Sequence, residues 1–152
     1  MRLSQHFKLW EFLVSETAIR NDVDMTPPDE VLENLTRLCR DYLEPLRKEL
    51  DSPIVITSGF RPMVLNTLIG GSITSSHIDG EAVDFHSLSY KPLEVCRVIR
   101  DTIEVYDQNI HEFGKWTHLG IGPRKRKQDL TAYRKEGKTK YSLGLTKIKD
   151  LV

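Results

Sequence analysis

Two histidines and one aspartate have the residue types and the spacing needed to hold a metal ion. His77 and Asp84 stand seven positions apart, with Gly80 between them, so that a loop and the strand after it can fold back on one point. His118 is the natural third ligand, because an imidazole in an apolar strand needs a polar partner. Two imidazoles and one carboxylate leave a coordination position of zinc open for water or substrate.

Each of these residues also has a simpler interpretation. A histidine in a strand is often a hydrogen-bonded structural residue, and a spacing of seven between a histidine and an aspartate arises by chance in many polar loops. From the spacing alone, a metal site and a set of structural polar residues both stay open.

The composition is that of a globular protein with one core. The chain has 152 residues, of which 39% are hydrophobic and 29% charged, and we expect a single domain over residues 1–152. With 22 basic and 22 acidic residues the formal net charge is zero, so no global field attracts nucleic acid or a membrane. Basic residues are concentrated in 123–140, which we expect to be a basic C-terminal segment.

The sequence contains no apolar stretch long enough to span a membrane. The first residues, MRLSQHFKLWEFL, have no apolar run of signal-peptide length, because charged and polar residues interrupt it. We therefore expect a protein made in the cytoplasm without an export signal of its own. Cys39 and Cys96 are expected to be buried free thiols rather than a disulfide.

Hydrophobic periodicity predicts three helices. Apolar residues recur at helical spacing over 7–20, 31–42 and 95–106. The second helix should begin at TPPDE, with Thr26 as its N-cap and the prolines in its first turn. Pro45 should kink this helix or end it.

Four segments have the composition or the alternation of strands: 53–58, 82–86, 115–121 and 139–144. GGSITSS, residues 70–76, is predicted to be a loop, because paired glycines and hydroxyls favour turns. Helices followed by strands with one intervening helix predict an α+β fold. In it, N-terminal helices pack on a small, mostly antiparallel sheet that carries the metal site.

Three motifs give the chain a more specific resemblance. SGFRP, SSHIDGEAVDF and EFGKWTHLG, in this order, resemble the D-alanyl-D-alanine carboxypeptidase-like family of zinc peptidases. FLVSETAIRNDVDMTPPDEVLENLTRLCRDYLEPLR resembles the helical part of the phage-type branch, which includes endolysins, and RKRKQDLTAYRKEGKTKY resembles its C-terminal segment. The resemblance implies one zinc ion, with His77, Asp84 and His118 as its ligands.

The resemblance also implies roles for two residues near the ligands. Arg61 matches the arginine that holds the carbonyl oxygen or the C-terminal carboxylate of the substrate, and a planar, permanently charged guanidinium suits either group. The alternative is a surface arginine that closes the turn after a strand. Ser75 matches a serine that contacts the substrate or braces the ligand loop, and by itself it is a loop hydroxyl.

The chain departs from the family pattern at the general base. Many members carry a glutamate three residues before the last histidine, where this chain has Lys115, and an ammonium group cannot accept the proton. Glu112 is the closest acid and our candidate for the catalytic base. The alternative is a structural acid that pairs with Arg61 or Lys115. His86 and His111 are other candidate proton carriers, which we expect to lie at the surface or behind the ligands.

The resemblance implies a zinc peptidase that hydrolyses peptide bonds of peptidoglycan stem peptides, of the D,D or L,D type, as a carboxypeptidase or an endopeptidase. A phage or prophage endolysin would wait in the cytoplasm until another protein opened the membrane, and would then act at the cell wall. One alternative is a non-catalytic member of the same fold that only binds wall peptide.

A second alternative is a nucleic-acid-binding protein, suggested by the run RKRK. The zero net charge and the lack of an interleaved aromatic platform argue against it. We expect the basic residues from Arg124 to Lys140 to be solvated or to contact anionic wall polymers.

Overall fold

The computed structural model describes residues 1–152 and contains a six-stranded sheet with helices around it. The α-helices are α1 (Glu16–Arg20), α2 (Asp29–Leu38), α3 (Glu44–Leu50), α4 (Met63–Leu68) and α5 (Pro92–Thr102). The strands are β1 (Ile54–Ser58), β2 (Ala82–Ser87), β3 (Gln108–Glu112), β4 (Trp116–Gly120), β5 (Gln128–Lys135) and β6 (Lys138–Leu143). The remaining helical turns are η1 (Leu9–Phe12), η2 (Cys39–Leu43) and η3 (Ile148–Asp150).

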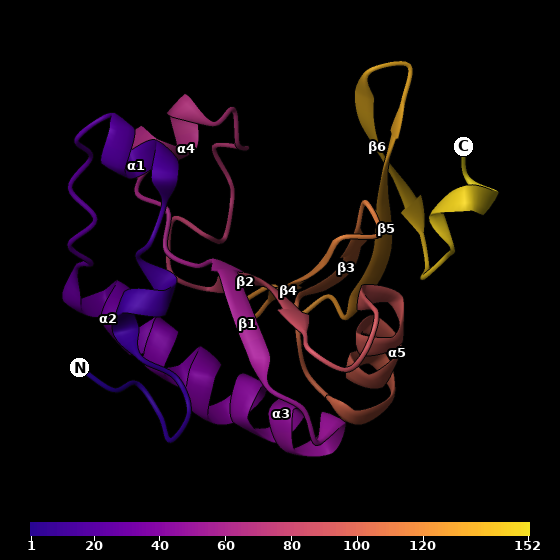
Figure 1. Ribbon diagram of the computed structural model, residues 1–152, viewed down its shortest axis with the longest axis horizontal. Helices are drawn as coiled ribbons and strands as arrows, with labels where there is room; N and C mark the ends of the chain where they lie inside the picture. Colours follow the sequence, from indigo (N-terminus) through magenta and orange to yellow (C-terminus); the bar gives the residue numbers. More distant parts are fainter.

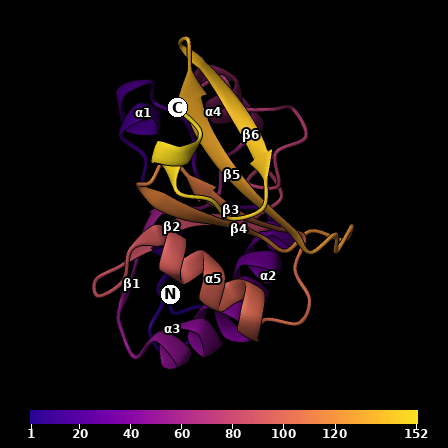
Figure 2. The same cartoon turned by 90° about the vertical axis from the view of Figure 1, so that its right-hand side faces the viewer.

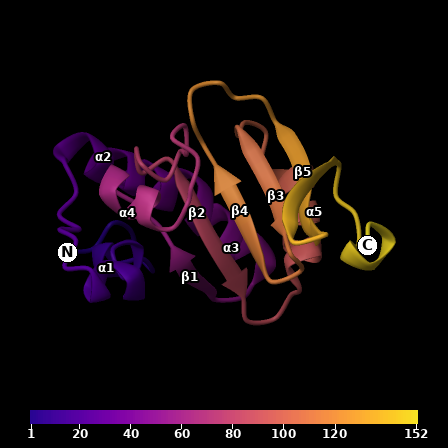
Figure 3. The same cartoon turned by 90° about the horizontal axis from the view of Figure 1, so that it is seen from above.

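The strands lie in the order β1-β2-β4-β3-β5-β6, as the view from above shows (Figure 3). Every neighbouring pair is antiparallel except β3 and β5, which run parallel. The predicted α+β fold with N-terminal helices and a mostly antiparallel sheet is therefore confirmed.

The two faces of the sheet differ in what covers them. Helices α2, α3 and α5 lie on one face, while α1 and α4 on one side and the β5–β6 hairpin on the other rise beyond the opposite face (Figures 1 and 2). The apolar stripe of α2, formed by Val31, Leu35 and Leu38, is buried in the main core together with Phe85 and Leu119 from the sheet. Helices α2, α3 and α5 therefore cover one face of the sheet and leave the opposite face open to a functional site.

The prediction of one helix over 7–20 is wrong. The segment forms two short pieces, η1 and α1, and Trp10 and Val14 from the expected apolar face are exposed. The Ser15 side chain accepts a hydrogen bond from the Ala18 backbone N–H at 3.2 Å, so this serine begins a new helix instead of continuing the old one.

The second helix starts later than predicted. Pro28, not Thr26, is the N-cap of α2, and both prolines lie outside the helix. The reason is that a proline restricts the residue before it to extended conformations. At the other end the helical path continues through the wider π-helical turn η2 into α3, and Pro45 is the second residue of α3. Pro45 therefore does not end the helical path. The third helix ends at Thr102, short of the predicted 106.

The four predicted strands correspond to β1, β2, β4 and β6, but β3, β5 and the short helix α4 were missed. In β3 the sequence QNIHE does not look like a strand, because Asn109 and His111 are buried polar residues on the face toward α5. Cys39 and Cys96 are buried and unpaired, as expected. No helix has both the length and the hydropathy needed to cross a bilayer.

Candidate metal centre

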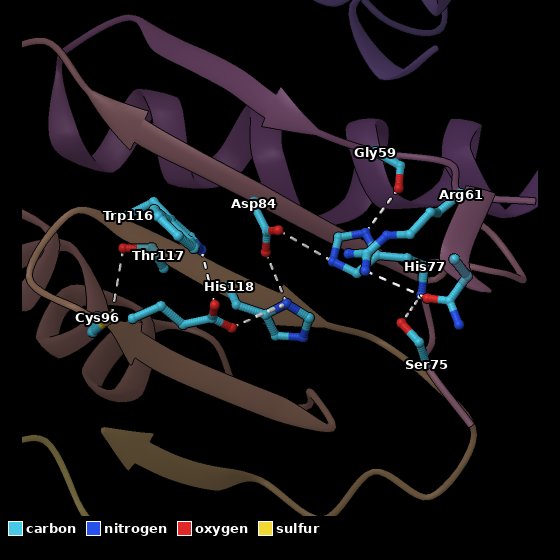
Figure 4. A network of polar contacts seen from close by, with 11 residues as sticks. Gly59, Arg61, Ser75, His77, Asp84, Cys96, Trp116, Thr117 and His118 are labelled. Atoms are coloured by element: carbon cyan, nitrogen blue, oxygen red, sulfur yellow. Dashed lines mark hydrogen bonds and ion pairs between the residues drawn. The ribbon is translucent and has the colours of Figure 1, made fainter. Parts of the chain in front are cut away.

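The three predicted metal ligands come together on the open face of the sheet. Asp84 of β2 and His118 of β4 are direct cross-strand partners, so their side chains point to the same face. His77 reaches them from the loop between α4 and β2, and this loop is joined to the chain after β1 by a hydrogen bond from the Arg61 backbone N–H to the His77 carbonyl (3.0 Å). Figure 4 shows both imidazoles directed at the carboxylate between them.

The distances within this cluster fit one metal ion. Asp84 Oδ2 lies 3.3 Å from His77 Nε2, and Asp84 Oδ1 lies 2.9 Å from His118 Nδ1. One donor atom from each residue lies within 4.8 Å of the other two. In a tetrahedral zinc site with bonds of about 2.1 Å, neighbouring donor atoms are about 3.4 Å apart. The cluster needs only small side-chain shifts to meet that geometry.

The tautomer of His77 is also the one that a metal requires. Its Nδ1–H donates to the Gly59 carbonyl at 2.7 Å, which leaves the lone pair on Nε2. Nε2 is buried and has no hydrogen-bond partner. A backbone carbonyl on the far ring nitrogen is the usual device that orients a metal-ligating histidine. The residues present therefore fit a zinc ion.

The electrostatics of the cluster keep the aspartate ionised. Burial lowers the pKa of His77 and so favours its neutral form. For Asp84 burial acts in the opposite direction, but the interactions with the neighbouring His77 and His118 rings outweigh it and lower the pKa of the carboxyl. For His118 burial is outweighed by the hydrogen bond to Asp84, which raises the pKa of the ring. A metal ion would compete with the proton on that ring.

Glu112, the candidate catalytic base, lies beside the cluster. It stands opposite Trp116 in the β3–β4 register, and Trp116 Nε1 donates a hydrogen bond to its Oε2 at 3.0 Å. Its Oε1 lies 3.7 Å from His118 Nδ1. Burial raises the pKa of this carboxyl. One oxygen is thus held by tryptophan, while the other faces the candidate ligands.

The alternative role considered for Glu112 is that of a structural acid paired with Arg61 or Lys115. Lys115 is exposed in the β3–β4 turn and borders a separate hollow with Phe113 and Trp116. Neither Lys115 nor Arg61 forms an ion pair with Glu112, whose charged neighbour within 4 Å is His118. The structural pairing considered from the sequence is therefore absent.

His86 and His111, the other candidate proton carriers, lie outside the cluster of His77, Asp84 and His118. His111 is buried on the opposite face of β3, where its Nδ1 bonds the Thr146 carbonyl at 3.1 Å. His86 lies two residues past Asp84 and does not line the cleft above the cluster.

Arg61 and Ser75 both line that cleft. Arg61 is more than a surface residue that closes a turn, because its Nε is buried without a partner and its Nη1 lies 3.4 Å from Asn66 Oδ1. Ser75 Oγ accepts a hydrogen bond from the His77 backbone N–H at 3.3 Å. The contact made by Ser75 is thus a brace on the ligand loop, and contact of either residue with a substrate stays a prediction.

The cleft has a volume of about 690 Å³, and only two of its 22 lining residues are hydrophobic. Its floor is formed by β2, β4 and β3, and its walls by the loop before β2 and by Thr139 and Tyr141 of β6. Local sequence patterns do not single out Gly59, Asn66 or Tyr141. The alternation of TKYSLG places Tyr141 and Thr139 on the same face of a strand. Without the strand order, however, the sequence does not show that this face borders the cleft.

The basic segment 123–140 comprises the connection after β4 and most of the β5–β6 hairpin. One of its cations is already paired, since Arg126 Nε lies 2.8 Å from Asp107 Oδ1. The predicted contact with anionic wall polymers gains no support from this arrangement and stays a prediction.

Two buried histidines and an aspartate, next to a glutamate and at the floor of a polar cleft, are the parts of a mononuclear zinc hydrolase site. The family model described as peptidase M15 matches residues 5–120, and the chain belongs to this family. The resemblance found in the sequence is thereby confirmed. M15 peptidases are zinc-dependent and act on peptidoglycan-type substrates. A search among curated proteins found no match.

Proposed function

We propose that the protein hydrolyses peptide bonds in peptidoglycan stem peptides with one zinc ion held by His77, Asp84 and His118. The observation that supports this most is the convergence of three donor atoms within 4.8 Å in a chain of the M15 family. The carbonyl of Gly59, which fixes the tautomer of His77, adds independent support.

Glu112 is the general base in this proposal. A zinc ion, when bound, polarises the scissile carbonyl and lowers the pKa of a coordinated water toward about 7. Because Trp116 holds Oε2, the Oε1 atom of Glu112 is free to accept the proton of the attacking water and to return it to the leaving amine. The raised pKa of this buried carboxyl brings its proton affinity closer to what both transfers require.

Arg61 and the polar cleft would bind the substrate. Stem peptides carry carboxylates and backbone carbonyls, and the guanidinium of Arg61 can hold either group. A carboxypeptidase would use it for the C-terminal carboxylate, and an endopeptidase for a carbonyl oxygen near the scissile bond. Either activity is compatible with a wall-degrading enzyme such as an endolysin, acting at the bacterial cell wall.

The test measures bound metal and released products together. We expect His77→Ala, Asp84→Ala and His118→Ala to lose bound zinc in elemental analysis and to release no amines from purified wall. Glu112→Gln should keep zinc but lower turnover by about 10²–10⁴-fold. Mass spectrometry of the digested muropeptides identifies the bond that wild type cuts.

His86→Gln is the matched control, because it changes a histidine two positions from Asp84 that does not line the cleft. It should retain both zinc and activity. Full zinc content and normal hydrolysis in any of the three ligand variants would contradict the proposal. A wild-type protein that holds zinc and binds sacculi but releases no amine would instead support the non-catalytic alternative.

A further inference from the structure

Strand β6 lies beyond residue 120, where the family match ends, yet it contributes one aromatic side chain, Tyr141, to the cleft that contains the candidate catalytic groups. In the antiparallel β5–β6 pair Tyr141 stands opposite Ala132, and in the parallel β3–β5 pair Ala132 stands beside Glu112. Directly paired residues in a sheet point to the same face. Tyr141, Ala132 and Glu112 therefore form one row across the open face.

Ala132, the middle residue of this row, has a small side chain, so the side chains of Tyr141 and Glu112 can approach each other. Two strand spacings amount to about 9.6 Å, and a tyrosine side chain spans most of that length. Ala132 carries only a methyl group, so nothing in the row blocks the ring. Tyr141 lines the cleft together with Glu112, Asp84 and Thr139.

The phenol hydroxyl of Tyr141 is available as a donor. Tyr141 is 59% exposed, and a tyrosine keeps its proton at neutral pH; partial burial, followed by the negative charges of Glu112 and Asp84, raises its pKa further. No side-chain hydrogen bond contributes to that shift. This differs from Tyr106, whose hydroxyl is bound to Asp129 at 2.7 Å.

The opposite wall of the cleft carries a second donor. Arg61 lines the same cleft from the segment after β1, and its Nε has no partner. A peptide lying over the floor between these walls has a cation on one side and a neutral phenol on the other.

We propose that Tyr141 Oη donates a hydrogen bond to the carbonyl oxygen of the scissile peptide bond and stabilises the negative charge that builds on it during attack. This inference rests on the proposed peptidase function and adds a catalytic residue to it. The proton stays on the phenol throughout, so no covalent or proton-transfer step is involved. The bond strengthens as charge develops, and it therefore acts on turnover more than on substrate binding.

The experiment compares Tyr141→Phe with wild type and with Tyr133→Phe on stem-peptide hydrolysis. Tyr133 is a matched control, because it lies in the same hairpin, stands opposite Lys140 and does not line the cleft. For Tyr141→Phe we expect a fall in kcat of about 10- to 100-fold, with KM changed by less than about threefold. Zinc content should be unchanged, and the affinity for a phosphinate analogue of the stem peptide should fall by the same factor as kcat.

Three results would overturn the inference. Wild-type kcat in Tyr141→Phe is one, a change confined to KM is another, and an equal loss in Tyr133→Phe is the third. Each of these leaves the proposed function intact, because the wild-type protein still cuts its substrate. A zinc-loaded wild-type protein without hydrolysis would instead remove the proposed function.

Discussion

The two walls of the cleft are attached to the molecule in different ways. The loop wall, residues 59–81, is irregular chain and the short helix α4, and individual hydrogen bonds fix it in place. The hairpin wall, β5 and β6, continues the sheet and takes its position from the strand register. In Figure 1 they stand on opposite sides of the floor.

The loop wall carries the candidate metal ligand His77, and several of its hydrogen bonds involve that residue. Gly59 accepts from the His77 ring, and the Arg61 N–H donates to the His77 carbonyl. The Phe60 N–H donates to the Phe12 carbonyl at 2.8 Å, which ties the wall to η1. A ligand has to be held within a fraction of an ångström to share an ion, and irregular chain reaches that accuracy only with such bonds.

The hairpin wall carries no candidate ligand and lies beyond residue 120, where the family match ends. Its tip is exposed around Gly137, far from any packed core. We infer from this difference that the loop wall sets the geometry of the proposed metal site and that the hairpin wall contacts the substrate. Changes in the loop wall should therefore alter metal affinity, and changes in the hairpin wall should leave it alone.

The largest effect is expected for Gly59→Ala in the loop wall. A Cβ at this position would lie 2.6 Å from Phe12 Cα and 2.7 Å from the Phe12 carbonyl oxygen, so backbone has to move. We expect a loss of about 3 kcal/mol in the free energy of unfolding, measured by urea denaturation. Because the Gly59 carbonyl orients His77, zinc affinity in a chelator competition should fall by about 10- to 100-fold.

Gly137→Ala is the control from the hairpin wall. Its φ is +73° but no atom lies within 4 Å of the added Cβ, so only the cost of a left-handed conformation applies, about 1 kcal/mol. Zinc affinity should equal that of wild type. If Gly59→Ala also binds zinc as wild type does, the loop wall does not set the ligand geometry.

A smaller effect is expected for Asn66→Ala, which tests whether the loop wall also sets Arg61. Asn66 is buried, donates to the Ser72 carbonyl at 2.8 Å and accepts from Arg61 Nη1. Its removal should cost about 2 kcal/mol of unfolding free energy. KM for a stem peptide should rise, since the guanidinium loses a contact that orients it, while zinc content stays the same.

Asn34→Ala is the matched control for that experiment. Its side-chain N–H donates to the Asp79 carbonyl of the same wall at 2.9 Å, but this bond is exposed. We expect a cost below about 0.5 kcal/mol and no change in KM. An unchanged KM in Asn66→Ala would mean that Arg61 is positioned without it.

The sequence predicted the floor of the site much better than its walls. The strands that carry Asp84 and His118 have strong apolar alternation, and the motifs around them are specific. The pairing that brings Tyr141 into the row with Glu112 depends on a parallel β3–β5 contact, and no local pattern encodes strand order. Asn66 and Gly59 act through contacts with distant residues, which spacing along the chain does not reveal.

The smallest effect concerns the base of the hairpin wall, where Asp107 is bound by Arg126. The carboxylate accepts from Arg126 Nε at 2.8 Å, from Nη2 at 3.0 Å and from the backbone N–H at 3.2 Å. These bonds lower the pKa of Asp107 below its ordinary value, although its burial opposes the shift. A carboxyl with a depressed folded-state pKa adds stability above its unfolded pKa of about 3.9 and loses it as pH falls further.

Asp107→Asn should therefore be about 1 kcal/mol less stable than wild type at pH 7, and the difference should shrink as pH falls below about 4. Asp101→Asn is the control, because Asp101 makes the same two side-chain bonds with Arg100 on the exposed surface, and no measurable change is expected. Urea denaturation of the three proteins between pH 7 and pH 3 provides the measurement, and their zinc affinities at pH 7 should be equal. Equal stability of Asp107→Asn and wild type over that range would show that strand register alone holds the hairpin wall, and a loss of zinc affinity would show that the two walls are not independent.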